Sequence, residues 1–102
     1  MKYMLSWTTR VTGTAAENEQ SAKRALQLYQ KWTPPSGLQI LAWVARIDGE
    51  GGYALVETDD AATIADITGK FGPLLTSQVH PVLEMADWAQ VVGAGIEWRG
   101  SA

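Results

Sequence analysis

Residues 38–58, LQILAWVARIDGEGGYALVET, contain two apolar runs separated by a glycine-rich segment. The first run is rich in β-branched and aromatic residues, which favour strands, and the segment from Asp48 to Gly52 has the composition of a turn. Two such runs joined by a few glycine-containing residues are typical of an antiparallel hairpin. We therefore predict strands at 38–48 and 52–58, and this hairpin decides the fold.

The segments around this hairpin add one strand and one helix on each side. Alternating apolar and polar residues, helix-capping residues and prolines mark their limits. In chain order we expect a strand at 2–9, a helix at 14–32, the hairpin, a helix at about 60–72, a strand at 74–84, and a short helix at 85–92 before a glycine-containing tail at 93–102. The order βαββαβ predicts a ferredoxin-like α+β fold, with two helices on one face of a four-stranded antiparallel sheet.

The length of 102 residues fits one domain, with a core at residues 2–85 and a C-terminal addition at 86–102. Along residues 38–47, the odd-numbered and the even-numbered side chains are both largely apolar. This pattern is typical of a strand that is buried on both faces. Helices cover only one face in the predicted fold. A second sheet can cover the other face, so we predict a homodimer whose sheets pack face to face.

Charge and composition exclude several classes of partner. Eight lysines and arginines against eleven aspartates and glutamates give a net charge of −3, and the basic residues are scattered, so we predict no nucleic-acid partner. No apolar stretch approaches the roughly 20 residues that span a bilayer, and we see no signal peptide, so we expect a soluble, cytoplasmic protein without a membrane partner. Cysteine is absent and His80 is the one histidine, so no metal site is predicted.

The aromatic residues suggest a pocket. Five tryptophans and three tyrosines occur beside many alanines, and rigid rings among small residues either fill a core or wall a cavity. In the second case, a small hydrophobic or aromatic molecule would lie between sheet and helices in each protomer. The candidate lining residues are Tyr3, Trp7, Tyr29, Trp43 and Tyr53, together with His80. If Trp88, Ile96 and Trp98 of the C-terminal addition are exposed, partner binding becomes a further candidate role.

His80 and Glu57 are the candidate catalytic residues. A histidine titrates near neutral pH, and a carboxylate in an otherwise apolar strand has a raised pKa if it is buried. Structural roles compete with both assignments: His80 as a partly exposed residue at a strand end, and Glu57 as the ion-pair partner of Arg46 on the neighbouring strand. The sequence leaves open whether the protein is an enzyme.

Residues 43–60, WVARIDGEGGYALVETDD, with Trp32-x-Pro34-Pro35-x-Gly37 before them and Val79-His-Pro-Val82 after them, resemble a family of small bacterial proteins known only as a domain of unknown function. The resemblance covers residues 2–85. It implies the dimeric α/β-barrel group, which includes cofactor-independent monooxygenases, muconolactone isomerase and haem-using relatives. By analogy it implies, as the alternative to simple binding, a cofactor-independent monooxygenase or isomerase that uses His80 or Glu57 as acid or base. No cofactor is expected on this view, and haem bound through His80 is a further branch.

Overall fold

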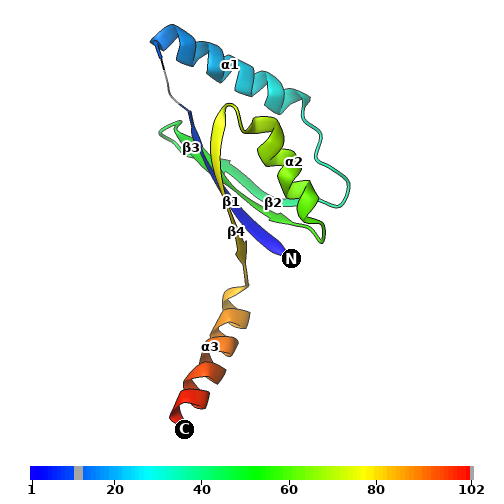
Figure 1. The fold of residues 1–102 in the computed structure, drawn as a ribbon, viewed down its shortest axis with the longest axis vertical. Coiled ribbons are helices and arrows are strands. Elements are labelled where there is room, and N and C mark those ends of the chain that lie inside the picture. Colours follow the sequence, from blue (N-terminus) through cyan, green and yellow to red (C-terminus); the bar gives the residue numbers. More distant parts are fainter. Residues whose placement is uncertain (11–12, 102) are drawn as a thin grey trace.

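The computed structural model describes residues 1–10 and 13–101, and its elements follow the order βαββαβα (Figure 1). In chain order they are β1 (Lys2–Thr9), α1 (Ala15–Lys31), β2 (Gln39–Ala45), β3 (Gly51–Glu57), α2 (Ala61–Phe71), β4 (Leu75–Val82) and α3 (Met85–Gly100). The first six elements confirm the predicted ferredoxin-like α+β fold.

The four strands form one antiparallel sheet in the order β2-β3-β1-β4. Leu5 of β1 pairs with Ala54 of β3 on one side and with Val79 of β4 on the other. Pro81 lies on β4 at the edge of the sheet, where its missing N–H removes no hydrogen bond from the sheet interior. The proline predicted an edge strand, a bulge or a strand end, and β4 is an edge strand.

Both helix starts lie where the capping residues predict them. Thr14 accepts a hydrogen bond from the Glu17 amide at 3.1 Å, and its hydroxyl lies 3.3 Å from the Glu17 carboxylate. Asp60 accepts one from the Ala62 amide at 3.0 Å at the start of α2. These local contacts fix where α1 and α2 begin.

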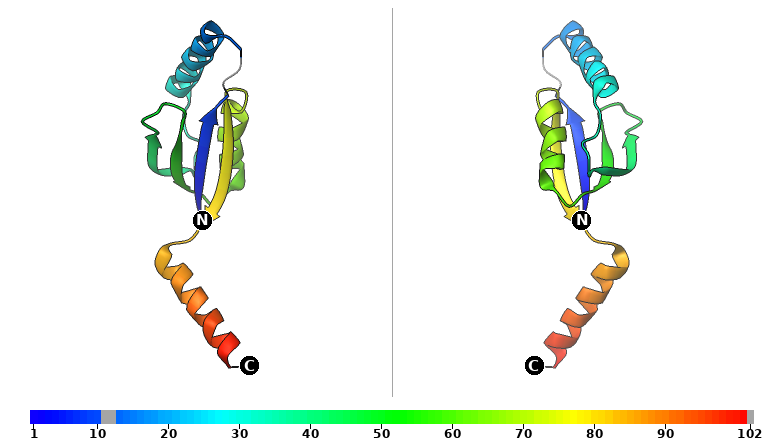
Figure 2. Two further views of the ribbon diagram at one scale, coloured as in Figure 1. Left: turned by 90° about the vertical axis from the view of Figure 1, so that its left-hand side faces the viewer. Right: turned by 90° about the vertical axis from the view of Figure 1, so that its right-hand side faces the viewer.

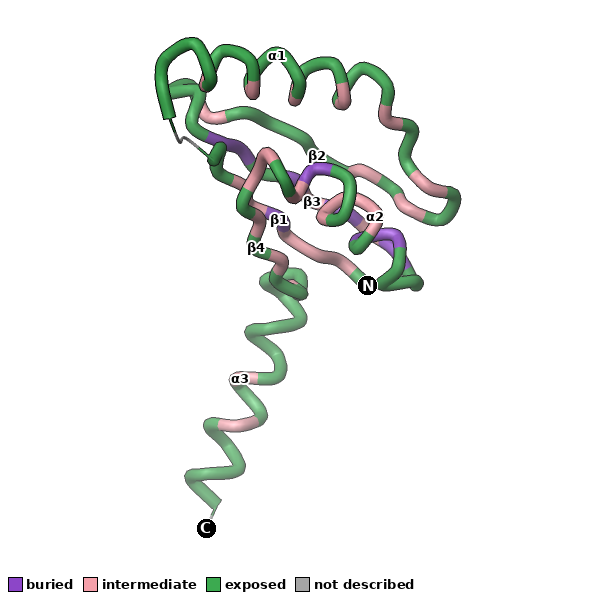
Figure 3. The backbone as a smooth tube through the Cα atoms, turned by 45° about the horizontal axis from the view of Figure 1, so that its top comes forward, coloured by how far each residue is buried: buried purple, intermediate pink, exposed green. Residues whose placement is uncertain are grey.

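The core lies on the face of the sheet that carries α1 and α2 (Figure 2). Leu5, Ala54, Val56 and Ile64 form its buried cluster. Figure 3 shows the buried segments in the central strands and in α2, whereas α1 and α3, which the structure describes throughout, contain no buried residue. The core is therefore built between the sheet and α2, and α1 is less closely packed.

A β-bulge at Leu41 changes which side chains of β2 face the core. The register with β3 shifts at this residue, so Leu41 has no partner strand residue. Strict alternation predicts Ile40 and Trp43 on opposite faces, but they pair with Val56 and Ala54, which share the core face. The prediction of unbroken alternation in this strand is therefore wrong, and the extra residue brings Trp43 to the helix-covered face.

The other face of the sheet, here called the open face, carries no helix. Its apolar side chains come from all four strands and are Met4, Ala42, Val44, Tyr53, Leu55 and Val82. Val44 is 56% exposed and Tyr53 is 47% exposed. A single protomer thus leaves apolar surface of the sheet in contact with water.

α3 corrects the prediction of a short helix and a glycine-containing tail. The helix runs from Met85 through Gly93 and Gly95 to Gly100, and it projects from the end of β4 away from the sheet (Figure 1). Because of this projection the molecule measures 63 × 30 × 20 Å. Within the described residues, no helix is long and apolar enough to cross a membrane.

Gly51 and Gly52 allow β1 to lie against β3. A Cβ on Gly51 would lie 1.9 Å from the carbonyl oxygen of Trp7, and one on Gly52 would lie 2.3 Å from the Trp7 ring. Both glycines are buried strand residues, and the strand begins at Gly51, one residue before the predicted start at Gly52. Glycine is needed here because another backbone and a large ring approach closely.

We predict that Gly52→Ala lowers the free energy of unfolding by roughly 1–3 kcal/mol, because the added methyl group overlaps the Trp7 ring. Gly69→Ala in α2 is the control: nothing lies within 4 Å of its Cβ position, and alanine stabilises a helix by about 0.5–1 kcal/mol relative to glycine. Urea unfolding followed by circular dichroism measures both. Equal midpoints for the two variants would contradict this account.

Candidate functional site

A cavity of about 500 Å³ lies between α1, α2 and the core face of the sheet. This volume is within the range of small-molecule sites, about 300–1,000 Å³. The helical segments contribute Ala22, Ala25, Leu26, Tyr29, Trp32, Ile67 and Phe71, and the strands contribute Leu5, Trp7, Thr9, Ile40, Trp43, Val44, Ala45, Ala54, Val56, Leu75 and Ser77.

The cavity exists because small and large residues are separated along α1. Ala22 and Ala25 face the sheet along the helix, and alanine side chains are too short to fill the space beneath them. The large rings are Tyr29, in the last turn, and Trp32, at the C-cap. Both contact Trp43 of β2, so the rings support one end of α1 while the alanines leave space along the rest.

Four rings form a continuous series of edge-to-face contacts along this end of the cavity. Tyr29 lies 5.2 Å from Trp43, Trp43 lies 5.7 Å from Trp32, and Trp32 lies 6.0 Å from Phe71, measured between ring centroids. The interplanar angles are 66°, 86° and 78°. Pairs of this geometry contribute about 0.5–1.5 kcal/mol each beyond the area they bury. The series joins α1 to β2 and α2.

Trp32 is held in place by a carboxylate of α2. Its indole Nε1–H donates to Asp66 at 3.0 Å, and Lys70 lies 2.8 Å from the other oxygen of the same carboxylate. The hydrogen bond from Lys70, followed by the one from Trp32, lowers the pKa of Asp66 below its ordinary value of 3.8. Since an indole has a single N–H donor, Trp32 presents only apolar ring surface to the cavity.

The described residues that line the cavity carry no formal charge at neutral pH. Tyr29 is the one ionisable side chain among them, and Thr9 and Ser77 add hydroxyl groups. A charged molecule placed here would lose its hydration without gaining a counter-ion. The wall therefore suits an uncharged, apolar molecule with few hydrogen-bonding groups.

The predicted lining residues divide between the two faces of the sheet. Trp7, Tyr29 and Trp43 lie together in the cavity wall. Tyr3 packs against the core cluster but lies outside the wall, and Tyr53 lies on the open face. Alternation correctly places Tyr53 and Ala54 on different faces of the sheet, but it does not say which of the two faces the helices cover.

Trp32 and Phe71 belong to the cavity wall and were not predicted as site residues. For Trp32 a signal was present, because it ends the stripe of apolar residues spaced by three or four along α1. For Phe71 the sequence signal indicates only the apolar edge of α2. Its contact with Trp32 depends on how α2 crosses the sheet.

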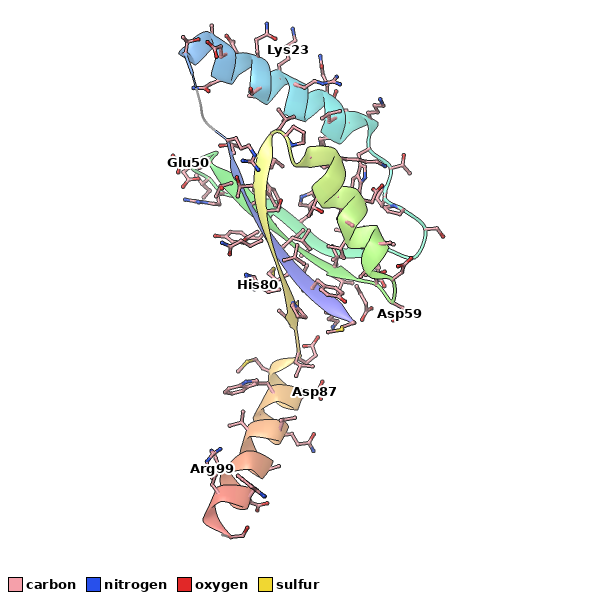
Figure 4. The ribbon with its side chains drawn as sticks, in the orientation of Figure 1. Lys23, Glu50, Asp59, His80, Asp87 and Arg99 are labelled. Atoms are coloured by element: carbon pink, nitrogen blue, oxygen red, sulfur yellow. The ribbon has the colours of Figure 1, made fainter. Side chains whose placement is uncertain are left out.

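His80 lies on the open face, opposite Met4 of β1 and across the sheet from the cavity. Its Nε2 is 3.3 Å from the side-chain oxygen of Gln78, and the residue is exposed. Figure 4 shows it beside β4, away from α2. The sheet separates His80 from any molecule in the cavity, so the residues present do not fit a haem held in the cavity by this histidine.

Glu57 also lies on the open face, where it pairs with Lys2 of β1 and Gln39 of β2. The predicted ion pair between Arg46 and Glu57 is wrong. Arg46 instead pairs with Asp48 in the β2–β3 turn. Among residues 1–10 and 13–101, no three histidine, aspartate or glutamate side chains come close enough together to hold a metal ion.

Comparison with known proteins identifies one family and solved structures of low sequence identity. The family profile described as a domain of unknown function, DUF3303, matches residues 1–96. The solved structure of SnoaB, described as a cofactor-independent oxygenase from Streptomyces nogalater, is 13% identical over 82% of this chain and 93% of its own, with a TM-score of 0.36. The de novo designed protein Foldit4 is 14% identical over 81% of this chain and 100% of its own, also with a TM-score of 0.36. No curated protein matches the chain.

We predict that Asp66→Ala increases the motion of the Trp32 ring, because the ring loses its hydrogen-bond acceptor. The lowered pKa of Asp66 means that the ionised carboxylate favours the folded state. Its contribution is complete above pH 3.8 and is lost as the pH falls through the lower pKa of the folded state.

The effect is measured by NMR, as the rate of hydrogen exchange of the Trp32 indole N–H from neutral pH down to below the pKa of Asp66. Exchange should accelerate in Asp66→Ala at neutral pH and in the wild type only at the acidic end. Asp59→Ala removes a fully exposed aspartate and serves as the control. Indistinguishable exchange in Asp66→Ala and Asp59→Ala would argue against the proposed restraint.

Proposed function

The chain belongs to the DUF3303 family of domains of unknown function, and we propose that it binds a small, uncharged, hydrophobic or aromatic molecule in the cavity beneath α1. The observation that carries this proposal is the cavity wall. Rings from two helical segments and two strands surround alanines, and no formal charge lies among the described lining residues. Apolar walls with a few hydroxyl groups are typical of sites for small hydrophobic ligands.

Binding is better supported than acid–base catalysis. The alternative, a cofactor-independent monooxygenase or isomerase, needs a residue that takes a proton from the bound molecule. His80 and Glu57 are the residues proposed for this step, and both lie across the sheet from the cavity. The lining hydroxyls of Thr9 and Ser77 suit a hydrogen bond to the ligand, and this supports a role in holding it.

We further propose that the protein is a homodimer in which two open faces pack together. The helices cover only the other side of the sheet, and Val44 and Tyr53 are about half exposed. Leu55 and Met4 pair at the centre of the open face. A two-fold partner offers the same apolar surface in return, so one contact covers both sheets.

We predict that 2-naphthol binds and that 2-naphthoate does not, because the second molecule carries a carboxylate into an uncharged cavity. The readout is the five indole N–H signals in a ¹H–¹⁵N spectrum at neutral pH. Signals of Trp7, Trp32 and Trp43 should shift with 2-naphthol, whereas those of Trp88 and Trp98 on α3 should not. Absence of shifts across a panel of neutral aromatic compounds would rule out the proposed function.

Ala25→Leu tests whether the ligand occupies this cavity. The larger side chain fills part of the space beneath α1 and keeps a good helix former, so the affinity for 2-naphthol should fall about tenfold or more. Ala16→Leu, at an exposed position of the same helix outside the wall, is the matched control. Equal affinities for the two variants would place the ligand elsewhere.

We predict that Leu55→Glu dissociates the homodimer, because it places a charge at the centre of the buried contact between open faces. Ile47→Glu is the control, since Ile47 is fully exposed in the β2–β3 turn. Light scattering after size exclusion should report a dimer at micromolar concentration for the wild type and Ile47→Glu, and a monomer for Leu55→Glu. A monomeric wild type would refute the dimer.

A further inference from the structure

α3 has the composition of a packed helix, but none of its residues is buried. Only Asp87, Glu97 and Arg99 are charged among its 16 residues, and its apolar residues lie on all sides. Ile96 is 58% exposed and Trp98 is 76% exposed. A helix that is apolar on all sides is normally buried.

The stability of α3 also requires a partner. Gly93 and Gly95 lie in its interior, and each glycine costs about 0.5–1 kcal/mol relative to alanine. Its start carries no side-chain capping hydrogen bond. An isolated helix of this length is marginal in water even with a favourable sequence. Contacts with another surface must therefore supply the stability that the helix itself lacks.

The apolar surface of α3 is continuous with the open face. Val82 belongs to the open face through its pairing with Lys2. It also lines a shallow apolar hollow of about 370 Å³ with Pro81, Leu83, Met85 and Trp88, at the junction of β4 and α3. The same junction is braced by an ion pair between Lys2 and Glu84, whose hydrogen bond raises the pKa of Lys2 and lowers that of Glu84.

We propose that α3 is an arm that packs against a second copy of this chain and extends the contact between open faces. This inference rests on the proposed homodimer and assigns part of its interface to a segment outside the sheet. Two-fold symmetry makes the exchange reciprocal, since each copy offers one arm and receives the other.

The arm and the open face together offer enough apolar area for a stable dimer. Six large apolar side chains are exposed on α3 and the residues leading to it: Leu83, Met85, Trp88, Val91, Ile96 and Trp98. Taking about 150–250 Å² for a fully exposed large side chain, and the exposed fraction of each, these six present on the order of 600–1,000 Å² per chain. A standard interface buries about 800 Å² per partner, so arm and open face together reach this size.

A second copy fits this surface better than a lipid bilayer does. Helices that lie on a membrane have an apolar face and a polar face rich in lysine and arginine. α3 has apolar residues on all sides and a single basic residue, Arg99. Figure 4 shows Asp87 and Arg99 at opposite ends of the projecting helix, with no basic face between them.

The test introduces Ile96→Glu and Trp98→Glu together into the full-length chain. Both residues lie in the distal half of α3, away from the hollow at its start and from the sheet of the same chain. The dissociation constant of the dimer, measured by light scattering, should rise at least tenfold. The indole signals of Trp7 and Trp32 should stay unchanged, which shows that the domain is folded. Ile47→Glu is again the charge control. The conservative double variant Ile96→Leu, Trp98→Phe should dimerise as the wild type does.

Hydrogen exchange of the wild-type α3 amides gives a second measurement that needs no variant. Their protection should increase with protein concentration, as expected for a helix ordered by dimerisation. If the Ile96→Glu, Trp98→Glu chain dimerises as the wild type does while Leu55→Glu is monomeric, the arm is refuted and the homodimer stands. Fast α3 exchange in a proven dimer refutes the arm in the same way. A monomeric wild type refutes both.

Discussion

The contact of Tyr29 and Trp32 with Trp43 sets the distance between α1 and the sheet, and the cavity depends on it. The two rings lie at the C-terminal end of α1, with centroids 5.2 and 5.7 Å from that of Trp43. Rings of this size are rigid and do not collapse onto the small residues beside them. Asp66 then fixes the edge of Trp32, so this end of the cavity is braced by α2 as well.

The distribution of apolar surface leaves much of it exposed in a single chain. Among the described residues, five hydrophobic side chains are buried, which is a small core for a domain of this length. Much of the remaining apolar surface lies in three places: the cavity, the open face and α3. We propose a ligand for the first and a second copy of the chain for the other two. On this proposal, folding, ligand binding and association draw on the same limited set of apolar residues.

Local signals in the sequence were sufficient to predict the order of the elements. Alternation in β1, the Thr14–Glu17 capping box and Pro81 at the edge strand each act over a few residues. Properties set by tertiary contacts were not predictable in this way. Alternation groups Tyr53 with Glu57 but cannot tell which face the helices cover. The length of α3 was missed because Gly93 and Gly95 disfavour helix locally.

Because of the bulge at Leu41, β2 contains one residue more than regular pairing with β3 requires. Residues after the bulge face the side that they would not face in a regular strand. Loss of Leu41 alone would remove the bulge and leave Ile40 opposite Val56 and Trp43 opposite Ala54, so the rest of β2 would keep its present faces. In an alignment of relatives, a gap at position 41 would therefore mark a regular β2 that still carries the aromatic wall, whereas a gap between positions 42 and 43 would turn the residue at position 43 to the other face.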